Sequence, residues 1–131
     1  MKTYLAIFYR LNMVAITDLA LDQKRRILSL SFDDGRTVDL SCEYLRVFSP
    51  SAEVRGHGPG QEVLQVGKED VNIVAIEPVG NYAVRLVFSD EHDTGLYAWP
   101  FLIELAEKKD ENWQDYLNRL EEAGHQRKKV S

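Results

Sequence analysis

The chain is poor in cysteine, and it has no apolar stretch long enough to span a bilayer. The single cysteine, Cys42, excludes an internal disulfide. This fits a reducing compartment, so we expect a cytoplasmic protein without a membrane partner. Cys42 itself has two interpretations. It is either a small buried hydrophobic residue, as free cysteines usually are, or a reactive or metal-binding thiol.

An excess of positive charge is also absent. Lys and Arg number 16 against 21 Asp and Glu, which gives a net charge of −5. A general nucleic-acid-binding protein normally carries a basic face, so we expect no nucleic-acid partner. The length of 131 residues and the hydrophobic content of 44% are those of one globular domain with a modest core.

The common catalytic motifs are missing as well. The sequence has no glycine-rich phosphate loop, dinucleotide fingerprint, nucleophile elbow or pair of cysteines. An iron site of two histidines and a carboxylate would need a His-x-Asp motif, and the nearest match, His92-Asp93, has the wrong spacing. We therefore expect a protein that is not an enzyme and that carries no cofactor.

Alternating apolar residues predict two antiparallel β-hairpins, over residues 26–40 and 71–88. In the second hairpin, Tyr82 is expected on the same inward face as the large apolar residues that follow it at every second position. Short additional strands are expected at residues 63–66 and 96–99. Both hairpins are expected to contribute to a sheet.

Helical periodicity predicts helices near residues 41–48, 100–108 and 110–123. Ser41 is placed to cap the first helix, and Pro100 suits the first turn of the second. Together with the hairpins, these helices predict an α+β fold in which antiparallel β-hairpins form a sheet with two to three short helices.

We expect a single domain over residues 16–123, with a separate segment at each end of the chain. Residues 1–15 are interpreted as an N-terminal extension with Met13 as the true start, or alternatively as an added strand or partner-binding arm. We expect removal of residues 1–12 to cost less than about 1 kcal/mol of folding stability. Residues 124–131 form a basic tail that is either solvated or makes a short contact.

Two short segments carry a resemblance to a known family. They are Leu45-Arg46-Val47-Phe48-Ser49-Pro50-Ser51-Ala52-Glu53-Val54 and Phe88-Ser89-Asp90-Glu91-His92-Asp93-Thr94-Gly95-Leu96-Tyr97. With Val79-Gly80-Asn81-Tyr82-Ala83-Val84 between them, they resemble the gamma-butyrobetaine hydroxylase-like N-terminal domain family over residues 16–107. The resemblance implies an α+β domain that is either a free-standing bacterial protein or fused to other proteins. The fused proteins include iron-dependent oxygenases and P-loop ATPases linked to iron–sulfur cluster delivery.

The resemblance also implies a zinc site, made by cysteines in a Cys-x-Cys-x-x-Cys pattern and a histidine in the later turn. In this chain those positions fall at Ser49, Ser51, Val54 and His92. Structural zinc usually takes four thiolate or imidazole ligands, so we expect no bound zinc. The serine hydroxyls are expected to hydrogen-bond His92 or the loop backbone in place of the metal. A ligand-binding role for His92 is the alternative.

The resemblance further implies that residues 49–57 lie beside residues 89–95, which would gather polar side chains on one edge. The candidate binding residues are Arg46, Ser49, Ser51, Glu53, Arg55, His57, Asp90, His92 and Asp93. A solvated loop held by ion pairs is the alternative interpretation of this edge.

Two functions follow from these observations. The first is a non-catalytic binding or adaptor domain that docks onto an iron-dependent oxygenase or an iron–sulfur-related protein. The second is a small metal- or ligand-binding protein that uses His57, His92 and nearby carboxylates.

Overall fold

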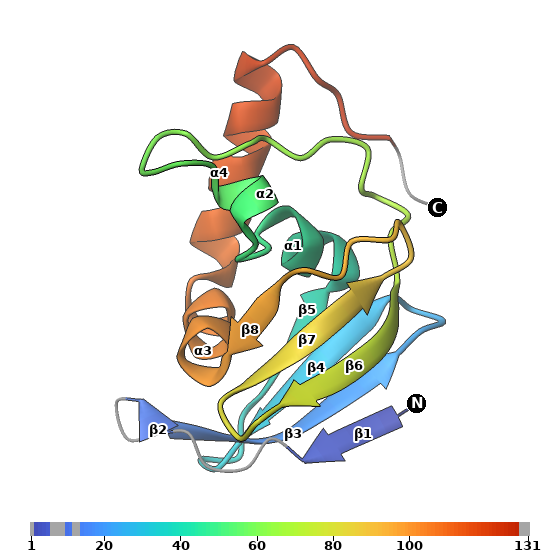
Figure 1. Ribbon diagram of the computed structural model, residues 1–131, viewed down its shortest axis with the longest axis vertical. Helices are drawn as coiled ribbons and strands as arrows, with labels where there is room; N and C mark the ends of the chain where they lie inside the picture. The colour runs from blue at the N-terminus through green and yellow to red at the C-terminus, as the bar shows by residue number, and fades with distance from the viewer. Residues whose placement is uncertain (1, 6–9, 12–13, 129–131) are drawn as a thin grey trace.

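The computed structural model describes residues 2–5, 10–11 and 14–128, the first two ranges by their backbone alone. Two antiparallel sheets lie face to face, and the helices gather along one side and one end of them (Figure 1). The first sheet consists of β1 (Lys2–Leu5), β3 (Val14–Asp22), β4 (Ile27–Phe32) and β5 (Thr37–Ser41) in this spatial order, with β2 (Arg10–Leu11) also paired to β3. The second sheet consists of β6 (Ile73–Val79), β7 (Ala83–Phe88) and β8 (Leu96–Ala98).

The helices complete an α+β fold, which confirms the predicted class. They are α1 (Cys42–Val47), α2 (Ala52–Arg55), α3 (Trp99–Glu107) and α4 (Lys109–Glu122). The two hairpins belong to different sheets that pack against each other. The short helix α2 is a difference, since no helix is predicted there from the sequence.

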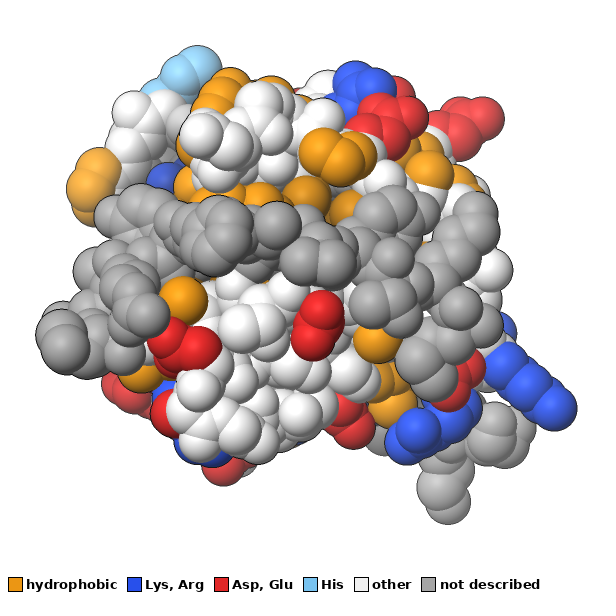
Figure 2. Space-filling view, turned by 90° about the horizontal axis from the view of Figure 1, so that it is seen from below, with side chains coloured by type: hydrophobic (Ala, Val, Ile, Leu, Met, Phe, Trp, Pro, Cys, Tyr) orange, Lys and Arg blue, Asp and Glu red, His pale blue; other side chains and the backbone are white. Residues whose placement is uncertain are grey.

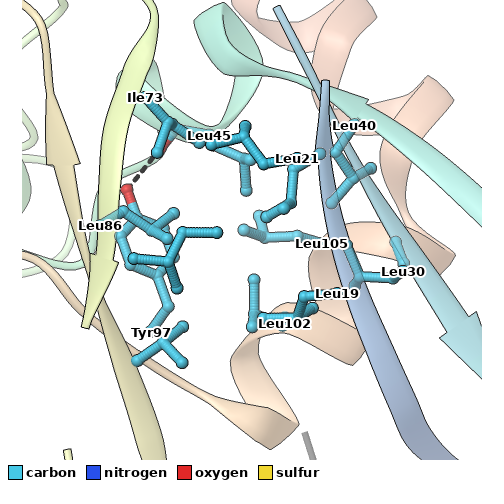
Figure 3. Packing of buried hydrophobic residues seen from close by; sticks show 14 of the residues in the cluster. Leu19, Leu21, Leu30, Leu40, Leu45, Ile73, Leu86, Tyr97, Leu102 and Leu105 are labelled. Carbon is cyan, nitrogen blue, oxygen red and sulfur yellow. Dashed lines mark hydrogen bonds between the residues drawn. The ribbon is translucent and has the colours of Figure 1, made fainter. Parts of the chain in front are cut away.

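The hydrophobic core fills the space between the sheets and is closed by helices α1 and α3. Figure 3 shows side chains from all of these elements pointing into this space: Leu19, Leu21, Leu30, Leu40, Leu45, Ile73, Leu86, Tyr97, Leu102 and Leu105. Each of them is almost fully buried. Burial of one large apolar side chain contributes about 1.5–3 kcal/mol, so this cluster is the main support of the fold.

Both predicted hairpins are present, with β4 paired to β5 and β6 paired to β7. Tyr82, however, is 55% exposed while Ala83 is buried. Tyr82 belongs to the turn that precedes β7, so its side chain does not follow the alternation of the strand. The predicted strand at residues 63–66 is also absent, because Val63 donates its N–H to the carbonyl of Val54 at the end of α2 (2.8 Å) and not to a neighbouring strand.

Apart from the added strand that is one interpretation of residues 1–15, no strand is predicted from the sequence before residue 26, yet β3 lies between β1 and β4 in the first sheet. A register shift between Ile16 and Asp18 breaks its alternation. Residues 2–5, which belong to the expected extension, pair with residues 18–21 of β3. Met13, the expected start, lies outside the described residues.

The helix caps follow the sequence prediction. The Ser41 hydroxyl accepts a hydrogen bond from the Tyr44 N–H (3.0 Å), and Pro100 lies in the first turn of α3. The Tyr44 hydroxyl then donates to the Leu105 carbonyl (2.7 Å) and accepts from the Asn112 side chain (3.0 Å). One tyrosine therefore ties α1, α3 and α4 together.

Four aromatic rings pack where α1 meets α4, and we refer to them as the aromatic cluster. Ring centroids lie 5.2 Å apart for Tyr44 and Phe48 and 5.2 Å apart for Trp113 and Tyr116. The cross pairs, Tyr44 with Trp113 and Phe48 with Tyr116, are separated by 6.4 Å and 6.3 Å. Tilted and edge-on pairs of this kind add about 0.5–1.5 kcal/mol each to the stability gained from burial alone.

The surface carries charges of both signs. On the face shown in Figure 2, Lys and Arg side chains lie next to Asp and Glu side chains. Part of the basic tail packs back onto the domain, since Arg127 pairs with Glu43 and Lys128 with Asp70. Lys129 lies outside the described residues. Among the helices that the structure describes, none is long and apolar enough to cross a membrane.

Candidate functional site

A buried histidine, His92, lies at the centre of the site, in the turn between β7 and β8. The Phe88 N–H donates to the His92 carbonyl (2.9 Å), and the Glu91 N–H donates to the Phe88 carbonyl (3.1 Å). Glu91 has a left-handed backbone conformation, with φ of 69°. The Asp90 carboxylate also accepts a hydrogen bond from the His92 N–H (3.3 Å). This turn holds the imidazole inside the protein, where 3% of the side chain is exposed.

The hydroxyls of Ser49 and Ser51 face the same nitrogen of His92. Their Oγ atoms lie 2.8 Å and 3.3 Å from the His92 Nε2 atom. Both serines come from the link between α1 and α2, and both are buried. We call Ser49, Ser51 and His92 the histidine clasp. The closeness of the two segments agrees with what the family resemblance implies.

The clasp depends on a glycine in the same turn. A Cβ atom on Gly95 would lie 2.6 Å from the Ser49 Oγ atom and 3.0 Å from the ring of Tyr97. Real Cβ atoms do not approach other atoms this closely, so any larger residue would push Ser49 away from His92. Under the clasp, the Tyr97 hydroxyl donates to the Leu45 carbonyl (2.6 Å), which fixes the end of α1.

A group of charged contacts lies beside the histidine clasp. Arg46 donates through Nε to the Asp90 carboxylate (2.9 Å) and through Nη1 to the Gln65 side chain (3.1 Å). Lys68 donates to the same oxygen of Asp90 (2.7 Å). Burial alone would raise the pKa of Asp90, but the hydrogen bonds and charges of Lys68 and Arg46 together hold that pKa below its usual value. Asp90 is therefore a charged anchor for both cations.

The environment favours the uncharged form of His92. Burial is the main cause that lowers the pKa of its imidazole, and the positive charge of Arg46 lowers it further. Glu53 acts in the opposite direction, with its carboxylate 3.5 Å from the His92 Nδ1 atom. Glu53 is itself exposed and accepts a hydrogen bond from the Thr94 hydroxyl (3.0 Å).

The contacts resemble those of a catalytic nucleophile, its base and an orienting carboxylate, with Ser49, His92 and Glu53 in these roles. A nucleophile must also reach a substrate, and Ser49 is 1% exposed with Gly95 packed against its hydroxyl. No bound substrate carbonyl could occupy that space without rearrangement of the turn. The clasp is therefore a structural contact between two segments in the described conformation.

The residues at the implied zinc positions do not fit a zinc ion. The Ser49 and Ser51 hydroxyls bind the imidazole nitrogen, and Val54 supplies a buried apolar side chain. Only His92 is a normal zinc ligand, whereas a structural site takes four. In the described part of the chain, no group of three or more His, Cys, Asp or Glu side chains is placed to hold a metal ion.

Cys42 lies apart from this region and is fully buried. Burial raises the pKa of its thiol to about 11, so the thiolate is scarce at neutral pH. A buried, protonated thiol is a poor nucleophile and a poor metal ligand. The structure therefore favours the interpretation of Cys42 as a small hydrophobic residue.

Three of the candidate residues lie away from the histidine clasp. Arg55 places its guanidinium 5.1 Å from the ring centroid of Phe101. His57 lies at an exposed position in the following loop, and Asp93 is exposed in the turn after β7. The candidate set thus divides into a buried clasp with its charged neighbours and a separate exposed group.

Arg55 and His57 of the exposed group border a groove of about 710 Å³, which lies between residues 56–65 and helices α3 and α4. Apolar side chains line it: Val47, Phe48, Val54, Val63, Leu64, Phe101 and Tyr116. Charged side chains line it too, and Arg55 and Arg119 supply positive charge while Glu62 and Asp115 supply negative charge.

Four residues of the site are not predicted from the sequence: Gln65, Lys68, Thr94 and Gly95. Gly95 carries a local signal, because glycine after Asp-Thr marks a turn in which backbone can approach another chain segment closely. Gln65 and Lys68 have no such signal. They belong to an irregular segment, and tertiary packing alone brings them to Arg46 and Asp90.

Known proteins resemble this chain in sequence and in structure. A family model described as gamma-butyrobetaine hydroxylase-like, N-terminal, matches residues 19–103. One NMR solution structure of a protein is 50% identical, with 95% of this chain and 93% of that chain covered and a TM-score of 0.76. A second is 45% identical, with 88% and 91% covered and a TM-score of 0.75.

A crystal structure is also similar to the chain. It is that of a protein of unknown function of the DUF971 family from Acidithiobacillus ferrooxidans, 36% identical, with 67% of this chain and 88% of that chain covered and a TM-score of 0.56. No curated protein matches the sequence. The family match includes both segments of the histidine clasp. This chain belongs to the gamma-butyrobetaine hydroxylase-like N-terminal family.

Proposed function

We propose that this chain is a non-catalytic binding domain that docks onto an iron-dependent oxygenase or an iron–sulfur-related protein. The observation that carries the proposal is the contrast between the buried histidine clasp and the open groove beside it. The clasp holds the candidate chemical groups out of reach, whereas the groove offers a surface for contact. The partner class rests on the resemblance to domains fused to such proteins, which is an argument by analogy.

The groove has the composition of a contact surface. Apolar side chains such as Val54 and Phe101 line it together with charged side chains such as Arg55 and Arg119. Protein interfaces commonly combine apolar and polar side chains. Val63 is 51% exposed on the wall of the groove, which makes it available to a partner.

A pair of matched variants tests this function. Val63→Asp places a charge in the groove, and Val74→Asp places one on β6, outside the groove, at a residue with nearly the same exposure of 49%. Wild type and both variants are used as baits in native extract of the source cells, and the captured proteins are identified by mass spectrometry. We expect an iron-dependent oxygenase or iron–sulfur-related protein with wild type and Val74→Asp, and its loss with Val63→Asp.

Capture of no such protein, or equal capture by all three baits, contradicts the proposal. Circular dichroism and thermal melting of each bait show whether it is folded. The folded control is needed because an unfolded bait would also lose its partner.

A small-ligand-binding function is the second candidate, and the groove volume favours it. Ligand pockets usually measure about 300–1,000 Å³, and the groove falls within that range. His57 borders the groove, whereas His92 is turned into the clasp, so the two histidines do not act together there. Native mass spectrometry of protein purified without an affinity tag tests this candidate. A retained small molecule that Val63→Asp releases would support it over the docking function.

A further inference from the structure

The last described residues of the chain return to the body of the domain. Helix α4 is followed by Gly124, which has a φ of 77°, and the His125 N–H donates to the Leu120 carbonyl (2.9 Å). This turn reverses the chain direction after the helix. Lys128 then binds Asp70 through its ammonium group (2.5 Å). The segment between these two contacts carries Arg127 across the surface.

Arg127 enters a site that is built for its guanidinium group. Its Nε and Nη2 atoms donate to the two carboxylate oxygens of Glu43, at 2.9 Å and 2.6 Å. The guanidinium carbon lies 5.2 Å from the ring centroid of Trp113. Two parallel hydrogen bonds and an aromatic face match the planar shape of a guanidinium, and they fit an ammonium group less well.

Glu43 is unusual for a carboxylate because only 8% of its side chain is exposed. A carboxylate so deeply buried is destabilising unless a cation accompanies it. Its hydrogen bonds are the main cause that raises the pKa of Arg127, which shows how closely the two charges depend on each other. The site therefore requires a positive group, whichever molecule supplies it.

The surroundings favour a cation as well. A cavity of about 390 Å³ adjoins the pair, and Tyr44 and Trp113 contribute to its walls. Three carboxylates line it, those of Asp39, Glu43 and Asp110, together with the cations Lys109 and Arg127. Without Arg127 the lining would hold three negative charges and one positive charge. This cavity is separate from the groove of the proposed docking function.

We propose that Glu43 and Trp113 form a guanidinium-binding site that Arg127 fills within the chain, and that an arginine side chain of a partner protein takes the site when the tail is displaced. The tail then acts as an internal competitor. A tethered group has an effective concentration on the order of millimolar, so a free guanidinium compound competes poorly with it. Removal of the Arg127 side chain should open the site.

The test uses the full chain and nuclear magnetic resonance of the Trp113 indole N–H. N-acetyl-arginine methylamide is titrated into wild type, Arg127→Ala and the double variant Arg127→Ala with Glu43→Gln. We expect a saturable shift in Arg127→Ala, a response at least about tenfold weaker in wild type because of the tethered competitor, and none in the double variant. Equal binding in all three proteins, or no saturable shift in Arg127→Ala, overturns the proposal.

A further arm separates charge from shape. Ethylguanidinium should shift the indole signal of Arg127→Ala, whereas ethylurea, which has the same shape without the charge, should leave the signal unchanged. Equal shifts with the two compounds contradict the proposal.

If Arg127→Ala loses its fold, thermal melting replaces the titration. Ethylguanidinium at millimolar concentration should then raise the melting temperature of Arg127→Gln, and ethylurea should not. No recovery by ethylguanidinium contradicts the proposal. Failure here leaves the groove variants of the proposed function unaffected, since Val63 does not line this cavity.

Discussion

The Nε2 atom of His92 lies 2.8 Å from the hydroxyl oxygen of Ser49, a residue that precedes it by 43 positions in the chain. This bond joins the end of α1 to the turn between β7 and β8, and both partners are buried. His92 therefore contributes to the packing of the domain interior, although a histidine in a loop would be expected to be exposed.

Removal of His92 should therefore reduce stability. We expect His92→Ala to lower the free energy of unfolding by about 1–3 kcal/mol, because it removes the imidazole partner of the buried Ser49 and Ser51 hydroxyls, although Ser49 still accepts from the Ser51 N–H. Arg55→Ala should cost at most about 1 kcal/mol, since it removes one exposed cation–π contact with Phe101. Urea denaturation measures both values. A larger loss for Arg55→Ala than for His92→Ala would contradict the division of the site into a buried clasp and an exposed group.

The stability of the domain should fall in mild acid. Because burial lowers the pKa of His92, the unfolded chain binds a proton at this residue more readily than the folded chain does. The contribution of neutral His92 is thus present above about pH 6.5 and is lost as the pH falls below it. Wild type should show a lower urea midpoint at about pH 5.5 than at about pH 7.5, both of which lie above the usual titration of carboxylates.

His92→Gln is the control for this pH dependence. Its amide occupies the place of the imidazole Nε2 atom and does not titrate in this range. The difference between the two urea midpoints should shrink in the variant. An unchanged difference would mean that other groups cause the loss of stability.

Gly95→Ala tests the close approach that the clasp requires. The added methyl group would meet the Ser49 Oγ atom at 2.6 Å, so we expect a loss of about 1–3 kcal/mol. Gly58→Ala is the matched control, since a Cβ atom there meets nothing within 4 Å. Combining Gly95→Ala with Ser49→Ala should recover part of the loss by removing the clashing oxygen. Equal melting temperatures for the two alanine variants would show that Gly95 has no special packing role.

The protein purified without an affinity tag should contain no stoichiometric zinc. Ser49, Ser51 and Val54 occupy three of the four implied ligand positions, and none of them is a ligand that zinc favours. Elemental analysis measures the metal, and a chelator should leave the melting temperature unchanged. Near-equimolar zinc, or a lower melting temperature after chelation, would show that another set of ligands exists.

Local sequence patterns predict the hairpins well because their causes are local. Residues 27–41 alternate between a buried and an exposed face, and a short turn joins the two strands, so pairing follows from neighbours in sequence. Strand β3 is harder to predict, since the register shift between Ile16 and Asp18 interrupts the alternation that marks a strand. The assignment of the two hairpins to separate sheets depends on long-range packing, which no local pattern carries.

The site likewise has parts that could be predicted from the sequence and parts that depend on long-range packing. The nearness of Ser49 to His92 is implied by the family resemblance, which carries information about the whole fold. The groove and the pairing of Arg127 with Glu43 are not implied by it, because they depend on how residues 56–65 and the tail settle against α4. A basic tail looks solvated in sequence, and the buried carboxylate that attracts it is 84 residues away.

The aromatic cluster between α1 and α4 lines both the groove and the cavity beside Glu43. Phe48 and Tyr116 line the groove, while Tyr44 and Trp113 line the smaller cavity beside Glu43. Each ring touches a ring of the other pair, at centroid separations of 5.2 Å for both Tyr44 with Phe48 and Trp113 with Tyr116. A ligand that displaces a ring in one hollow therefore changes the shape of the other hollow. Any effect of this ligand on the affinity of a second ligand in the other hollow is then equal in both directions.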